Sequence, residues 1–178
     1  MAKTESRENL LRKITSARHS LLLIMIFTVV NMVLTLLDAG TYFLFSLSVP
    51  YYLSALGMLM DAGAVGTFAI TGTVIGIIIL AVYLLCWLKS KKKTGWLTAA
   101  FVLMILDTAA LALFTFTLYE NPAVKLMDFL LHAWMLWDLF KGSSAGKKLK
   151  KLPAEDPEDV DLSSFYGSVT DGSDNVDL

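Results

Sequence analysis

Long apolar stretches alternate along this chain with short stretches that hold nearly all of its lysines and arginines. Residues 20–37 and 62–88 contain no charged side chain, and residues 96–119 contain one, Asp107. None of the three has the charged face that a helix at the surface of a soluble protein presents to water. A helix needs about 20 apolar residues to cross a bilayer core. The pattern therefore predicts membrane-spanning helices.

A fourth segment, residues 123–140, is apolar but holds four ionisable groups. The chain as a whole is 56% hydrophobic and 17% charged, whereas a soluble domain carries about a quarter charged residues. We therefore expect an all-α integral membrane protein, a four-helix transmembrane bundle within residues 20–141. A basic segment before it and a basic patch with an acidic tail after it would be cytoplasmic. The expected parts are residues 1–19, the spans 20–37, 62–88, 96–119 and 123–140, the outer element 41–60, and residues 142–178.

The positions of the basic residues predict the orientation of these spans. With four crossings, the two ends of the chain and the connection after residue 88 share one side. Fourteen of the fifteen lysines and arginines fall on that side, and only Lys125 falls on the other. Because cytoplasmic loops are rich in Lys and Arg, we expect a plasma-membrane protein with both termini in the cytoplasm. The densest part of this signal comes from Lys89, Lys91, Lys92, Lys93, Lys147, Lys148, Lys150 and Lys151.

Residues 41–60 are uncharged but do not fit a fifth span. A fifth crossing would move some of the basic residues to the wrong side. Ser46, Ser48 and Pro50 interrupt the segment, and its many aromatic residues suit the headgroup boundary. Pro50 fits the first turn of a helix, where no N–H is needed. We expect an outer-surface or re-entrant element, in which an aromatic hairpin leads into a short helix that continues toward residues 62–88.

The ends of the chain are expected to meet the cytoplasm and the lipid surface. The lysines of residues 142–152 would attract anionic headgroups or would serve only to set the topology. Residues 153–178 are acidic and poor in large apolar groups. Such a segment buries too little surface to offset its ordering entropy, so we expect a disordered tail. Residues 20–37 are interpreted as a retained first span and not as a cleaved signal peptide.

A line of small residues runs along residues 62–88. Its main members are spaced three or four residues apart, which keeps them on one helical face. Small side chains let helix backbones approach closely in lipid. We expect this face to pack either inside the bundle or against a second copy of the chain. Its members are Ala62, Gly66, Ala69, Gly72, Thr73 and Gly76.

Two polar residues lie deep inside predicted spans. Asn31 belongs to a polar stripe with Thr28 and Thr35. It alone needs a partner outside its helix, because Thr can bond its own backbone; a bond to another helix is the simplest explanation. Asp107 lies near mid-membrane, where an ionised Asp costs roughly 2.5–3.5 kcal/mol. It must be paired, face protein or water, or be protonated.

The fourth segment can bring further ionisable groups to Asp107. Asp128 and His132 are four residues apart and share a helical face. On antiparallel helices, His132 and Asp107 differ in depth by about one helical turn. We expect a cluster of Asp107, His132 and Asp128, with Asn31 as a fourth member. Asp138 points elsewhere, and we expect its carboxylate to reach water.

Three interpretations of this cluster remain open. It can be a structural Asp–His pair that fixes helix register, a proton- or cation-coupled transport site, or a metal or acid–base enzyme site. The third has the least support, since the chain has no HExxH, nucleophile elbow or phosphate loop. Cys86, the single cysteine, excludes an internal disulfide and a Cys-rich metal cluster. We expect no metal, cofactor or nucleic acid.

The run NMVLTLLDAGTYFLFSLSVPYYL and the ending HAWMLWDLFKGSSAGKKLKKLP resemble small uncharacterised multi-span membrane proteins of Gram-positive bacteria. This resemblance implies a class of membrane protein and no mechanism. We expect a non-enzymatic membrane subunit or accessory protein, which contacts the bilayer and a membrane or cytoplasmic protein. The alternative is a small proton- or cation-coupled transporter that uses the Asp/His cluster and works as a homo-oligomer.

Overall fold

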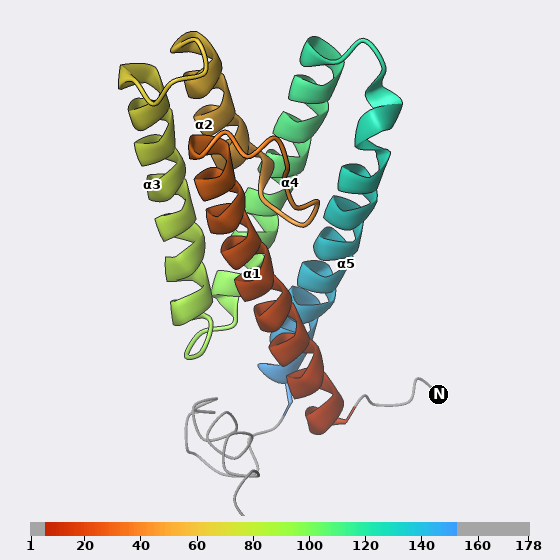
Figure 1. Ribbon diagram of the computed structural model, residues 1–178. Helices are drawn as coiled ribbons and strands as arrows, with labels where there is room; N and C mark the ends of the chain where they lie inside the picture. The colour runs from red at the N-terminus through yellow and green to blue at the C-terminus, as the bar shows by residue number, and fades with distance from the viewer. Residues whose placement is uncertain (1–5, 153–178) are drawn as a thin grey trace, which may run out of the picture.

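The computed structural model describes residues 6–152, and the regular secondary structure of this part of the chain is all helical, with no strand. Figure 1 shows two pairs of antiparallel helices, α2 with α3 and α4 with α5, and the long helix α1 that crosses between them. The predicted tail at 153–178 lies outside the described residues. The helices are α1 (Arg7–Leu36), α2 (Ser48–Met60), α3 (Thr67–Lys89), α4 (Gly95–Leu118), the 3₁₀ helix η1 (Pro122–Lys125) and α5 (Leu126–Leu149).

Three of the described helices, α1, α3 and α4, are long and apolar enough to cross a membrane. They contain most of the predicted spans at 20–37, 62–88 and 96–119, so the prediction of three apolar helices long enough to span a membrane is confirmed. Helix α5 is not among them: it carries Asp128 and Asp138, and its last nine residues, KGSSAGKKL, are polar. The crossing predicted for 123–140, and with it a four-helix transmembrane bundle, remains a prediction.

Helix α1 starts well before the span predicted to begin at residue 20. Ser6 caps its first turn by accepting a hydrogen bond from the Asn9 N–H. The first half of α1 packs against the polar half of α5, where Gly142 faces Ala17 with no room for a Cβ atom. Most of the basic segment is therefore part of a packed helix.

The segment between α1 and α3 enters the bundle and turns back. Residues 37–47 run from the end of α1 toward α4 and α5, and α2 then returns beside α3 (Figure 1). Helix α2 has 13 residues, about 20 Å at 1.5 Å per residue, which is too short for a bilayer core about 30 Å thick. We call residues 37–60 the re-entrant segment.

The short helix predicted within 41–60, with Pro50 in its first turn, is confirmed. The expectation that it continues toward residues 62–88 is wrong. Helix α2 ends at Met60, and residues 61–66 reverse the chain so that α3 packs antiparallel to it. Asp61 holds this reversal, because its carboxylate accepts the Ala69 N–H at 2.7 Å in the first turn of α3.

The small residues of α3 pack inside the molecule, against α2. A Cβ atom on Gly72 would strike the carbonyl oxygen of Leu53, and one on Gly76 would lie 3.1 Å from that of Pro50. Ala69 is fully buried on the same face. Thr73, half-buried, donates a hydrogen bond to Ser54. The predicted close approach of helices is therefore made within one chain.

Two members of the predicted line, Ala62 and Gly66, do not belong to it. Both precede α3, so they share no helical face with Ala69. Ala62 lies in the turn with a φ of 57°. Gly66 is the N-cap residue of α3, and a Cβ atom there would meet the side chain of Asp61. The Asp61 carboxylate needs this space to cap α3. As a result, α3 begins later in the chain than the apolar stretch at residues 62–88 predicts.

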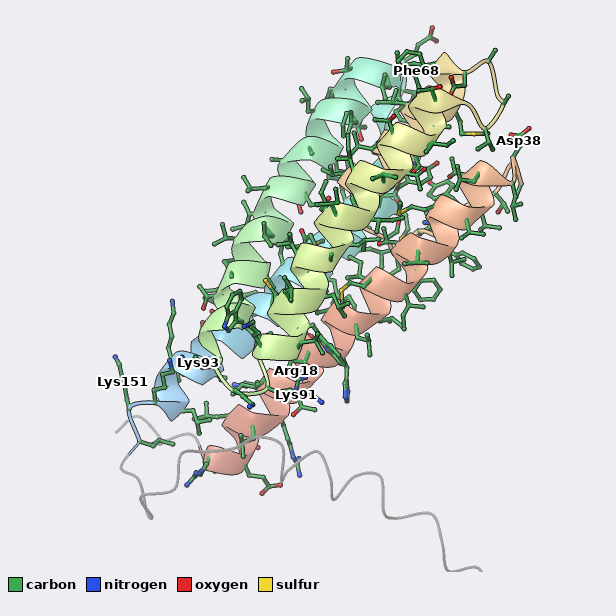
Figure 2. All side chains as sticks on the ribbon, turned by 90° about the vertical axis from the view of Figure 1, so that its left-hand side faces the viewer. Arg18, Asp38, Phe68, Lys91, Lys93 and Lys151 are labelled. Carbon is green, nitrogen blue, oxygen red and sulfur yellow. The ribbon has the colours of Figure 1, made fainter. Side chains whose placement is uncertain are left out.

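The two ends of the molecule differ in the charged side chains that they carry. Figure 2 shows Lys91, Lys93 and Lys151 together at one end, which we call the basic end, with Asp38 and Phe68 at the opposite end. The α3–α4 turn and the last turn of α5 both contribute to the basic end. The residues predicted to share one side of the membrane thus lie together.

Gly72→Ala should destabilise the protein, because the added methyl group forces α2 and α3 apart. Overpacking of this kind costs about 1–3 kcal/mol. The control is Gly95→Ala, where no heavy atom lies within 4 Å of an added Cβ. Thermal unfolding in detergent would measure both; equal melting temperatures for the two variants would contradict the α2–α3 contact.

Candidate functional site

The polar side chains inside the bundle gather around the backbone of the re-entrant segment. Residues 37–47 are not helical, and α2 begins beside the middle of α4. Backbone N–H and C=O groups in such a place have no water to bond and each needs a partner. The partners of these backbone groups come from α1 and α4, and they include two of the site residues predicted from the sequence, Asn31 and Asp107.

Asn31 binds the backbone N–H and the backbone C=O of Phe43 with the two ends of its carboxamide. Its Nδ2 donates to the Phe43 carbonyl and its Oδ1 accepts from the Phe43 N–H, each at 2.7 Å. Nδ2 also donates to Ser46 Oγ at 2.8 Å. The predicted bond to another helix is thus replaced by a bond to the re-entrant segment. Asn31 has no direct hydrogen bond to Asp107 or His132 in the described structure, so it is not a member of that cluster.

The start of α2 leaves no backbone donor without a partner. The first four N–H groups of a helix lack acceptors within it. Here the first belongs to Leu47, the N-cap residue, which donates to Thr28 Oγ1 of α1 at 2.8 Å. The fourth position is Pro50, which has no N–H. Ser48 and Val49 supply the other two.

Asp107 accepts both of these remaining donors. The Ser48 N–H binds Oδ2 at 2.8 Å and the Val49 N–H binds Oδ1 at 2.9 Å. The carboxylate, which is 3% exposed, thus caps α2 from another helix, where the positive end of the helix dipole also favours a negative charge. The burial of Asp107 is explained by this cap.

His132 joins the cap from α5, and the predicted meeting of His132 with Asp107 is confirmed. Its Nδ1 lies 2.9 Å from the backbone oxygen of Asp128, which can only accept, so Nδ1 carries a hydrogen. Its Nε2 lies 3.1 Å from Ser48 Oγ and 3.2 Å from Asp107 Oδ2. Two protonation states fit: a neutral ring that accepts from Ser48, or a cation that donates to Asp107. The pair can therefore hold or release one proton in a single heavy-atom geometry.

The carboxylate of Asp128 does not join Asp107 as predicted. It pairs with Lys125, whose Nζ lies 3.2 Å from Oδ2, and it accepts from the Tyr42 hydroxyl at 3.3 Å. The ammonium also donates to Tyr42 Oη at 2.9 Å and lies over the Tyr42 ring. Only the backbone oxygen of Asp128 touches the Asp–His pair.

Lys125 is buried, although lysines seldom are. Its ammonium lies 3.2 Å from Asp128 Oδ2 and donates a hydrogen bond to Tyr42 Oη. These contacts favour its charged form. Lys125, the one base that lies on the side opposite the others, is thus stabilised by the Asp128 carboxylate and by aromatic rings.

A small cavity separates this ion pair from His132. It has about 10 Å³ of space for the centre of a water-sized sphere, close to the minimum for one water molecule. Its walls come from the re-entrant segment, α4, η1 and α5. The lining residues that carry polar side-chain groups are Tyr42, Ser46, Ser48, Tyr51, Tyr52, Lys125, Asp128 and His132.

Asp138 is buried, so the expectation that it reaches water is wrong. Its carboxylate accepts from Ser20 Oγ at 2.8 Å and from Ser16 Oγ at 3.3 Å, and it pairs with Lys141 at 3.3 Å. The reason is the length of α1, whose first half covers this part of α5. Asp138 does point away from His132, as expected.

Sequence reasoning missed the roles of Ser48, Thr28 and Lys125. In the sequence, Ser48 interrupts an apolar run, and the structure shows that it begins a helix with no acidic side chain in its first turn and no side-chain cap from its N-cap residue. A helix start that lacks its own cap is a signal that another part of the chain can supply one. The described residues contain no group of three His, Cys, Asp or Glu side chains placed to hold a metal ion.

Comparison of the chain with protein-family models, with curated proteins and with solved structures finds no match in any of the three. The resemblance to small multi-span proteins of Gram-positive bacteria therefore remains an expectation.

Asp107→Asn should destabilise the protein, since the amide nitrogen would oppose either the Ser48 or the Val49 N–H. An unmatched buried donor costs about 1–3 kcal/mol. Chemical unfolding in detergent would measure the loss, and hydrogen exchange at Ser48 and Val49 should accelerate with it. The matched control is Asp38→Asn at an exposed position; a loss no larger than that of the control would contradict the capping role.

Proposed function

We propose that this protein is a non-enzymatic membrane subunit that acts through contacts with another protein. The observation that carries the proposal is the use of the intramembrane polar groups. Asn31, Thr28 and Asp107 all bind backbone of the re-entrant segment. Groups already committed to holding the fold are poorly placed to bind a substrate, which supports a scaffold.

The basic end is the proposed contact surface. Lys92, Lys93, Lys147 and Lys150 are exposed there, on the side that the distribution of basic residues assigns to the cytoplasm. The opposite end has no comparable charge. An acidic surface of a partner would complement these lysines, and such complementarity guides association. We place the protein in the plasma membrane, with α5 as a fourth crossing.

Proton-linked transport is the second candidate, and the contact between His132 and Asp107 favours it. The pair can hold or release a proton, and the cavity lies directly beside it. Intramembrane ionisable groups often belong to proton relays. Four short crossings enclose little space, so a transporter would act as a homo-oligomer.

A photo-crosslinking amino acid at Lys150 or Lys92 should yield an adduct with a discrete protein in intact membranes. The same group at Ala64, exposed at the opposite end, is the control and should yield none. Charge reversal by Lys92→Glu with Lys93→Glu should weaken the adduct at Lys150. Adducts with lipid only, or equal protein adducts from both ends, would contradict the proposed contact surface.

Proton flux separates the two candidates. Proteoliposomes with an internal pH-sensitive dye should respond to an imposed gradient no faster than empty liposomes if the protein is a contact subunit. Flux that Asp107→Asn and His132→Gln abolish, while Asp38→Asn leaves it intact, would instead establish transport. Both site variants must remain folded at the assay temperature.

A further inference from the structure

One oxygen of the Asp128 carboxylate is buried without a partner. Oδ2 is engaged by Lys125 and Tyr42, but Oδ1 has no hydrogen-bond partner among the described residues. Asp128 is 6% exposed and lines the cavity beside His132. A buried polar atom without a partner costs about 1–3 kcal/mol, and more if it is charged. The carboxylate thus requires a hydrogen-bond donor inside the cavity.

The cavity limits what that donor can be. Its volume of about 10 Å³, measured for water-sized spheres, suits one water molecule. Its walls offer the hydroxyl groups of Tyr42, Ser46 and Ser48, and a buried water needs 2–4 polar partners. A metal cation is disfavoured because the ammonium of Lys125 already lies 3.2 Å from the same carboxylate.

We propose that this cavity is a hydration site, in which one water molecule donates to Asp128 Oδ1. It lies between the Lys125–Asp128 ion pair and the ring of His132. Since η1, which ends at Lys125, lies toward the end of the molecule opposite the basic end, the proposed site would give His132 contact with water from that end. The proposal does not depend on which function the protein has.

Accessibility to the silver ion, a very small thiol reagent, tests this contact. Ser48→Cys, in a Cys86→Ser background, places the only thiol on the cavity wall. Silver added on the Ala64 side should protect this thiol from later maleimide labelling in denaturant, whereas silver on the Lys92 side should not. Leu106→Cys, beside Asp107 but on the exposed apolar face, is the control and should be labelled fully in both cases.

Protection of both thiols, of neither, or only from the Lys92 side would overturn the proposal. Because Ser48→Cys alters the hydrogen bond to His132, a second measurement keeps Ser48 intact. His19→Gln leaves His132 as the single histidine. In lipid nanodiscs, NMR magnetisation should pass from water to the Nδ1–H of His132 faster than to the Leu106 amide.

Asp128→Leu should remove this transfer, because the apolar side chain fills the cavity while the backbone oxygen that binds His132 remains. Transfer to His132 as slow as to Leu106 in the protein with the native cavity, or transfer unchanged in folded Asp128→Leu, would overturn the hydration site. If Asp128→Leu does not fold, the comparison of His132 with Leu106 decides alone.

Discussion

The rest of the structure depends on the need to satisfy backbone hydrogen bonds where a non-helical segment lies inside an apolar bundle. Irregular backbone is tolerated at such depth only where protein or water surrounds it. Here Asn31 binds the backbone N–H and C=O of Phe43, Thr28 accepts the N–H of the α2 N-cap residue, and Asp107 accepts the next two N–H groups. Two helices, α1 and α4, are therefore held to one segment by the backbone donors and acceptors of that segment.

This constraint gives the Asp107–His132 pair a structural role before any chemical one. Asp107 is negative where the α2 dipole is positive, and His132 can neutralise it by carrying a proton. A change in that proton would alter the cap of α2 directly. The same atoms can therefore serve a structural role or a proton-linked role. Measurements of proton flux and of protein stability distinguish these two roles, whereas the geometry does not.

The candidate site was partly visible in the sequence. Depth along a helix follows from residue number at 1.5 Å per residue, which placed Asp107 and His132 at matching levels. The sequence did not show in which direction each side chain points around its helix, or how long α1 is. The Asp128 carboxylate turned to Lys125, because a buried ammonium needs an anion, and Asp138 was covered by a helix that begins at Arg7. Lys125 is three residues from Asp128, but a hydropathy pattern does not show that the two side chains pair inside the protein, and Ser20 is 118 residues from Asp138 in the chain.

The sequence by itself determined the membrane class, the apolar helices and the gathering of basic residues at one end, because these follow from composition and period along the chain. Only the tertiary structure decided that α2 ends at Met60 and the chain reverses into α3, that Gly72 packs against α2 and that Asp107 caps it. Each of these depends on contacts between residues far apart in sequence. A polar or small side chain can be recognised in the sequence as one that requires a partner. The identity of that partner depends on how the helices pack.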